Sequence, residues 1–444
     1  MKNYFKYLAI CVSLFLGLMS CETNFDDPNA ATADQVFSSR EGIFAAAVGM
    51  QQLYSTTGLR FIVETPAITT REGGITTTFQ NMIELEDGGT ALPNFNSNVQ
   101  GLWSNMLQIL KIAEDIEANA PNIELEAGTR SGLIAHAKLF KALTIGSLAQ
   151  NYEQVITTSS NNNDASFISR NQGFQTALTL LNEAAAELAA TAPSAEFTDA
   201  ITLGNIDLVN TIRATTARYA LFSGNYEAAI TAATSVDLSV TSIFAYDGQN
   251  QNPIWARVIQ NDAPNFKPRD NFGLPEPTFT FDPADGRLSF YLVPLAESNQ
   301  NALPIEDIAG FFNEITEPIP VYLPDEMNLI IAEANLRLTS PNISAATAAL
   351  NEVLTDTDDP FEVNANLPAY SGASTVEALL LEVYKNRRAE LFLTGMSLED
   401  SRRFGRPQPT GTSMNYTEER NRNFYPYPDV ERNSNPNTPD DPSI

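Results

Sequence analysis

The chain has 444 residues, with 26 Lys and Arg against 54 Asp and Glu, so its formal net charge is −28. This excess of acid argues against nucleic-acid binding and against electrostatic docking on an anionic membrane, because both depend on Lys and Arg. The hydrophobic fraction of 43% suffices for a large core, and a single His argues against His-based metal or triad chemistry.

The first 21 residues have the pattern of a lipoprotein signal. Lys2 and Lys6 precede an apolar stretch, Tyr7–Met19, that is too short to cross a bilayer comfortably and suits a signal peptide. Leu18-Met19-Ser20-Cys21 resembles a bacterial lipobox, which implies cleavage before Cys21 and a lipid on its sulfur. We expect a signal peptide over 1–20, a tether over 21–35 and membrane attachment through lipid only. An ordinary secretory signal with a coincidental Cys is the alternative.

Cysteine usage agrees with export. The two Cys residues are Cys11, inside the signal, and Cys21. The mature body would therefore have neither a disulfide nor a free thiol, and its core alone would have to hold it together.

Several segments have helical periodicity and are predicted to be helices. In chain order they are 102–116, 133–149, 172–190, 213–222, 226–234, 325–338, 344–354 and 375–393. Long stretches between them have no such period and are rich in polar residues or Pro: 56–100, 157–170, 246–323 and 405–444. Loops of this length are often functional. We expect one mainly α domain over 36–444 with large irregular elaborations and little β structure.

The segment Ala217–Ile230 resembles one tetratricopeptide unit. Its Ala residues allow close packing of two helices, Gly224 permits the tight turn between them, and Tyr226 opens the second. No regular 34-residue repeat follows, so scattered, degenerate helix pairs are expected rather than a regular solenoid.

Blocks along the chain resemble the SusD/RagB family of Bacteroidetes outer-membrane lipoproteins, in the family's order. They are the Trp-containing helix 102–116, the helix pair around Gly224-Asn225-Tyr226, the "AEA" helix from Val321 to Ala334, the Arg387-Arg388-Ala389-Glu390-Leu391 helix with Gly395 and Asp400–Arg403, and the Pro- and Asn-rich ending after Phe424. The acidic residues that follow Cys21 also resemble a surface-export signal of such lipoproteins. Met396 and Ser397 depart from the family pattern and leave the subfamily open.

The resemblance implies a SusD-like helical domain built on degenerate tetratricopeptide-type helix pairs, with an N-terminal part over 36–240 and a C-terminal part over 241–444. It implies a cell-surface, outer-membrane lipoprotein that captures an oligosaccharide or a peptide. Its partner would be a SusC-like TonB-dependent β-barrel transporter, which the protein covers as a hinged lid during nutrient uptake. Neither catalysis nor a cofactor, metal or nucleic acid belongs to that role.

The first candidate site lies in the Pro- and Asn-rich stretch after residue 245. A sugar needs an aromatic platform for its C–H face, with amide or charged groups that reach its hydroxyls. Trp255 has Tyr246 upstream and Phe266, Arg269 and Phe272 downstream, which supplies both kinds of group. Equally, Trp255 could plug a loop onto the core.

The second candidate site is the segment 68–100, where Arg71, Phe79 and Phe95 stand among Thr, Gln and Asn. Family members often place ligand contacts in the loop before the Trp helix, which favours this stretch. Trp103 itself lies on the apolar stripe with Met106 and Leu110, so it is predicted to be a core residue.

Other charged groups are given structural interpretations. The late basic cluster consists of Lys385, Arg387, Arg388, Arg402, Arg403 and Arg406. Acids interleave with it at helical spacing, which favours ion pairs over an anionic ligand. His136 has no second His or available Cys near it in the sequence, and the acids around 282–285 and 358–359 lack EF-hand spacing.

Two other functions stay open. A tetratricopeptide-type scaffold on the cell surface would bind a protein and no nutrient. An extracellular glycoside hydrolase would need two carboxylates about 5–10 Å apart across a cleft; no motif supports it, although 54 acids leave the pair possible.

Overall fold

The computed structural model describes residues 33–260, 263–411 and 416–444. The predicted signal peptide, Cys21 and most of the tether therefore lie outside the described residues. Within the described part of the chain, no helix is both long and apolar enough to span a membrane.

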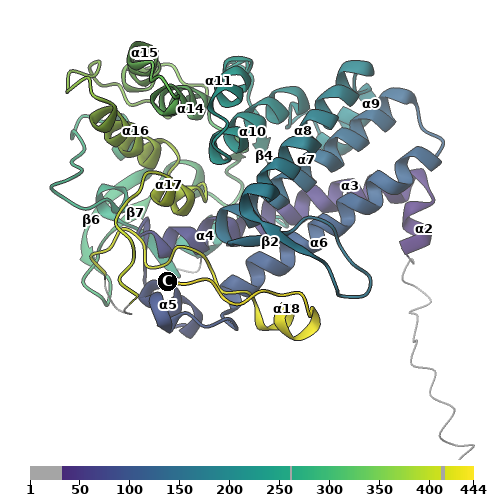
Figure 1. Ribbon diagram of the computed structural model, residues 1–444, viewed down its shortest axis with the longest axis horizontal. Coiled ribbons are helices and arrows are strands. Elements are labelled where there is room, and N and C mark those ends of the chain that lie inside the picture. Colours follow the sequence, from purple (N-terminus) through teal and green to yellow (C-terminus); the bar gives the residue numbers. More distant parts are fainter. Residues whose placement is uncertain (1–32, 261–262, 412–415) are drawn as a thin grey trace, which may run out of the picture.

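The mainly α class is confirmed, and the strands are few and short (Figure 1). The helices before residue 200 are α2 (Ala33–Phe37), α3 (Arg40–Leu53), α4 (Leu59–Thr69), α5 (Gln80–Asp87), α6 (Ser97–Asn119), α7 (Ala127–Asn151), α8 (Arg170–Ala190) and α9 (Ala195–Phe197), with shorter turns η1 (Tyr54–Gly58), η2 (Gly89–Ala91), η3 (Ala120–Asn122) and η4 (Thr198–Thr202). Those after it are α10 (Leu208–Phe222), α11 (Tyr226–Thr234), α12 (Trp255–Val258), α13 (Gly286–Tyr291), α14 (Pro324–Arg337), α15 (Ile343–Thr355), α16 (Val376–Glu390), α17 (Ser397–Arg403) and α18 (Asp429–Ser434), with η6 (Asp270–Gly273) and η7 (Gly310–Phe312).

The strands form antiparallel pairs. They are β1 (Gly73–Ile75) with β5 (Phe266–Pro268), β2 (Gln154–Ile156) with β3 (Phe167–Ser169), β4 (Ile243–Phe244) with β8 (Ile319–Pro320), and β6 (Leu292–Ser298) with β7 (Pro304–Ile308). A single bridge between Arg269 and Ile305 joins the first pair to the last. The β1–β5 pair ties the loop-rich stretch 241–323 to the segment after α4, while β4–β8 and β6–β7 pair strands within that stretch.

Helix α7 lies at the centre, packed against α6 on one side and α8 on the other (Figure 1). It is buried on almost every face, so it carries no strong amphipathic stripe. A Cβ on its Gly146 would lie 2.0 Å from the ring of Tyr219 on α10, so glycine is what allows this close approach.

The predicted tetratricopeptide-like pair is present as α10 and α11. Gly224 between them has a φ of +80°, and the Asn225 side chain caps α11 by accepting from Ala228 N at 3.3 Å. Helix α11 packs against α14, which in turn contacts α15 and α16. Helices α14, α15 and α16 enclose a small apolar core of their own, whereas most other buried residues belong to one large cluster. The division at residue 240 stays a prediction.

The prediction of an irregular stretch over 56–100 was wrong, because α4 and α5 lie within it, and α3 before it was not anticipated. Helix α4 even contains Pro66 and buries polar side chains such as Glu64 and Thr65. Its composition is poor for a helix, and packing against α6 and η1 stabilises it.

One π-helical turn, η1, joins α3 to α4 without a break, since the residues on both sides keep helical dihedrals. Tyr246 donates its hydroxyl to the carbonyl oxygen of Ser55 in this turn at 2.9 Å. A π turn holds one residue more than an α turn and leaves carbonyls available for such bonds.

Candidate functional site

Two phenylalanines predicted to contact ligand stand out from the surface. Phe79, just before α5, is 59% exposed, and Phe95, just before α6, is 63% exposed. Single exposed apolar residues are common, but two large rings at neighbouring helix starts offer a platform for a ligand.

Hydrogen bonds between the two helix starts hold these rings in one neighbourhood. Asn96 donates its Nδ2 to the carbonyl oxygen of Asn81 at 2.9 Å and to Glu84 Oε2 at 2.8 Å, and its Oδ1 accepts from Asn98 N at 3.0 Å, which caps α6. Asn81 also donates to the Asn98 side chain. The residues that flank Phe79 and Phe95 are therefore rigidly joined.

Buried Glu64 on α4 extends this network to α12. It accepts from Asn98 Nδ2 at 2.6 Å and pairs with the guanidinium of Arg257, whose Nη2 is 3.2 Å from Oε1. Arg257 lies two residues after Trp255, which opens α12 and is half-buried. The chain Asn81–Asn98–Glu64–Arg257 thus links the two segments that the sequence singled out separately. We call Phe79, Phe95, Trp255 and the polar chain that joins their segments the aromatic–amide face; Asn98 and Glu64 are buried beneath it.

Two other predicted residues have structural partners. The half-buried ring of Tyr246 uses its hydroxyl on η1, and burial raises the pKa of that hydroxyl. Arg269 bonds the neighbouring Asp270 through Nε at 3.2 Å, and its backbone N–H bonds Glu72 O at 2.8 Å. Both residues therefore have structural partners within the chain.

Three more predicted residues are buried and fall outside the aromatic–amide face. Phe266 lies in β5 over Gly73, and Phe272 packs edge-on against the rings of Phe281 and Phe392. Arg71 donates from Nη1 to Glu86 O at 2.8 Å, and burial lowers its pKa to about 10. Phe266 and Phe272 also pack on distant residues, Gly73 and Phe392, so local composition could not show their burial.

Sequence reasoning missed Glu64, Asn81, Asn98 and Arg257. An acid inside an otherwise apolar helical turn at Glu64 was the available signal, since a buried charge needs a partner. That partner, Arg257, is 193 residues away.

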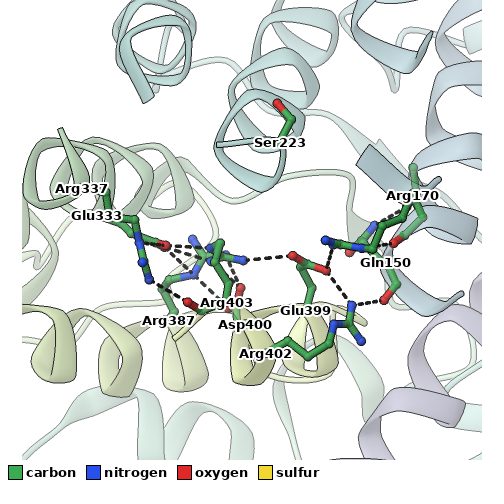
Figure 2. Close-up of polar contacts among 12 residues, drawn as sticks. Gln150, Arg170, Ser223, Glu333, Arg337, Arg387, Glu399, Asp400, Arg402 and Arg403 are labelled. Atoms are coloured by element: carbon green, nitrogen blue, oxygen red, sulfur yellow. Dashed lines mark hydrogen bonds and ion pairs between the residues drawn. The ribbon is translucent and has the colours of Figure 1, made fainter. Parts of the chain in front are cut away.

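The late basic cluster is structural, as predicted, and Figure 2 shows its members Arg387, Arg402 and Arg403. Arg387 pairs with Asp400 at 2.9 Å, Arg403 bonds Asp400 and Glu333 at 2.7 Å each, and Arg402 pairs with Glu399 at 2.6 Å. These guanidiniums hold the pKa values of the three carboxyls below their usual range, although burial acts the other way. The remaining members pair with Glu382, Glu72 and Glu419.

Trp103 is buried, as predicted, and donates its Nε1 to Glu431 at 3.1 Å. His136 is also buried, with Nε2 at 2.9 Å from Gln51 Oε1, and burial lowers its pKa to about 3. Among the described residues, no group of three or more His, Cys, Asp or Glu is arranged to hold a metal ion.

The fold is similar to those of solved structures described as SusD superfamily and SusD-like proteins. A SusD superfamily protein from Bacteroides thetaiotaomicron matches with a TM-score of 0.65 at 16% identity, covering 91% of this chain and 100% of its own. A SusD-like carbohydrate binding protein from Bacteroides fragilis matches with a TM-score of 0.68 at 13% identity, covering 90% and 99%. By sequence, no family model and no curated protein matches the chain.

Proposed function

We propose that the protein is a cell-surface lipoprotein that captures an oligosaccharide, or a peptide, on the aromatic–amide face. It delivers this ligand, without catalysis, to a SusC-like TonB-dependent transporter in the outer membrane. Cys21 carries the lipid anchor.

The SusD-like fold over about nine-tenths of the chain is the observation that carries this proposal. One protein with this fold is described as carbohydrate binding. The aromatic–amide face adds chemistry that suits such a ligand, because exposed rings can stack on the C–H face of a sugar while Asn81 and Arg257 reach its hydroxyls.

Titration of the purified protein with a panel of glycans and peptides tests the proposal, with intrinsic Trp fluorescence as the readout. The double variant Phe79→Ala/Phe95→Ala should bind the best ligand about tenfold or more weakly, since each aromatic contact contributes about 0.5–1.5 kcal/mol beyond area. Leu203→Ala is the control, because Leu203 is 67% exposed and lies in another loop.

Equal binding by native protein and the double variant would remove these rings from the site, and Trp255→Ala would then test the α12 side. No binding to any panel member, together with no β-barrel partner on purification from the membrane, would contradict the function and favour a protein scaffold.

A further inference from the structure

A groove of about 420 Å³ lies between α14, α16 and the turn after α17, away from the α4–α6–α12 network. Its floor is apolar: Leu380 and Leu381 come from α16, and Phe404 follows α17. Leu381 is 39% exposed, so the floor faces solvent. A volume of this size accommodates one or two side chains of a docked segment.

Three guanidiniums stand on the walls of this groove, those of Arg337, Arg403 and Arg406, against one acid, Glu377. The chain as a whole carries 54 acids and only 26 basic residues, so this concentration of positive charge is unusual for it. The carboxylates that pair with the three guanidiniums are buried behind them. Arg337 Nη1 and Arg406 Nη1 make no hydrogen bond to a described residue.

The buried network behind the groove has more guanidiniums than carboxylates (Figure 2). Arg170, Arg337, Arg387, Arg402 and Arg403 share only Glu333, Glu399 and Asp400. Each of the five guanidiniums has a carboxylate partner, but three carboxylates are shared among five, so the cluster carries a net excess of two positive charges.

Some N–H groups in this network also lack a hydrogen-bond acceptor among the described residues. Arg387 Nη1 and Arg403 Nη1 are buried without a hydrogen-bond acceptor among the described residues; Arg403 Nη1 is 3.9 Å from the nearest oxygen of Glu399. Burial, together with the charge of Arg170, lowers the pKa of Arg402 to about 10. Excess buried positive charge is costly, and an added carboxylate at the groove would offset it.

We propose that this groove docks an acidic segment of a protein partner. An apolar side chain of the segment packs on Leu381 and Phe404, while a neighbouring Asp or Glu carboxylate pairs with the outward N–H groups of Arg337 and Arg406. Guanidinium planes favour such carboxylates because they donate two parallel hydrogen bonds. The inference is independent of ligand capture on the aromatic–amide face.

The test measures fluorescence anisotropy of a labelled peptide, acetyl-Asp-Leu-Glu-Leu-Asp-amide, with the whole chain purified in detergent. We expect saturable binding that is at least fivefold tighter than for the isosteric neutral peptide acetyl-Asn-Leu-Gln-Leu-Asn-amide, and that weakens as salt rises. Leu381→Asp should reduce binding at least tenfold, because it removes the apolar floor and adds repulsion.

Val209→Asp is the matched control, since Val209 is 40% exposed on α10 and outside the groove; it should bind like the native protein. Circular dichroism of both variants separates loss of binding from loss of fold. Equal affinity for acidic and neutral peptides, undiminished binding by folded Leu381→Asp, or no acidic-peptide binding at millimolar concentration would each overturn the proposal. Loss of glycan binding in Phe79→Ala/Phe95→Ala would leave it intact.

Discussion

Glu333 shows how one buried carboxylate joins distant parts of the chain. It lies on α14 and accepts from Arg337 at 2.7 Å and from Arg403 at 2.7 and 2.9 Å, with Arg387 at 3.8 Å. Helical spacing along 382–403 pointed to pairs within that segment, such as Arg402 with Glu399, which exist. It could not point to Glu333, which lies on α14 and meets Arg387 and Arg403 only in the folded chain.

Glu333→Gln removes the charge that these three guanidiniums share and is expected to lower the free energy of unfolding by about 3–5 kcal/mol, as for other broken buried pairs. Urea denaturation followed by circular dichroism measures this. Glu377→Gln on the exposed side of α16 should change stability by less than about 0.5 kcal/mol. A loss below about 1 kcal/mol for Glu333→Gln would show that the carboxylate is dispensable.

The predicted site residues divide into exposed and buried side chains. Trp103 was assigned to the core from its helical stripe, and a stripe is a local property. Phe266 and Phe79 have similar polar surroundings in the sequence, but Phe266 pairs across β1 and β5 with residues almost 200 positions earlier. Only such long-range pairing decides which ring is exposed, so composition alone identified the segments but not their exposed members.

At the scale of elements, three buried carboxyls gather where α14 begins, α16 ends and the loop after α15 passes. Asp325, Asp359 and Glu390 each have one oxygen without a hydrogen-bond donor among the described residues. Arg287 lies near, but it bonds Asp285 through two nitrogens at 2.8 and 2.9 Å and approaches Glu390 only to 3.5 Å. Burial raises the pKa of Asp325 to about 7 and of Asp359 to about 6, and that of Glu390 upward as well.

The sign of the resulting pH dependence follows from proton uptake. Between about pH 4 and pH 7 native Asp325 keeps a proton that the unfolded chain has released, so stability falls as pH rises through this window. Buried His136 acts in the opposite direction, because the unfolded chain gains a proton below about pH 6.5 that the native ring does not.

Comparison with Asp325→Asn isolates the carboxyl from His136. The free energy of unfolding of the native protein, relative to that variant, should fall by about 3 kcal/mol from pH 4.5 to pH 8. Asp358→Asn, an exposed neighbour, should follow the native curve throughout. Parallel curves for native protein and Asp325→Asn would contradict the raised pKa. Urea midpoints at four pH values suffice.

Helices with a clear apolar period were predicted near their observed positions, as for α8 and α11. Helices α4 and α5 were missed because Thr, Gly and Pro dominate their surroundings, and burial against α6 outweighs those propensities. The order of the motif blocks predicted the SusD-like fold better than any single helix did. In the folded chain, the blocks on α14, α16 and α17 meet in one ion-pair network.

For the whole molecule, the proposed lipid anchor on Cys21 would decide where the protein works. Cys21→Ser should move the protein from the membrane pellet to the soluble fraction after detergent-free lysis, since acyl chains supply the membrane affinity. Cys11→Ser, inside the predicted signal peptide, should leave it in the pellet. Membrane retention of Cys21→Ser to the native extent would contradict lipidation at this residue.

The π turn η1 determines the direction in which the side chains of α4 point. The π turn accommodates one residue more than an α turn does. If residues 40–69 formed a regular α-helix instead, Glu64 would be rotated by about 100° about the helix axis, away from Asn98 and Arg257. A chain with one residue fewer and a plain α-helix would direct its α4 side chains the same way. Such a chain would align with this one only across a single-residue gap between Tyr54 and Gly58, although both would present the same surface.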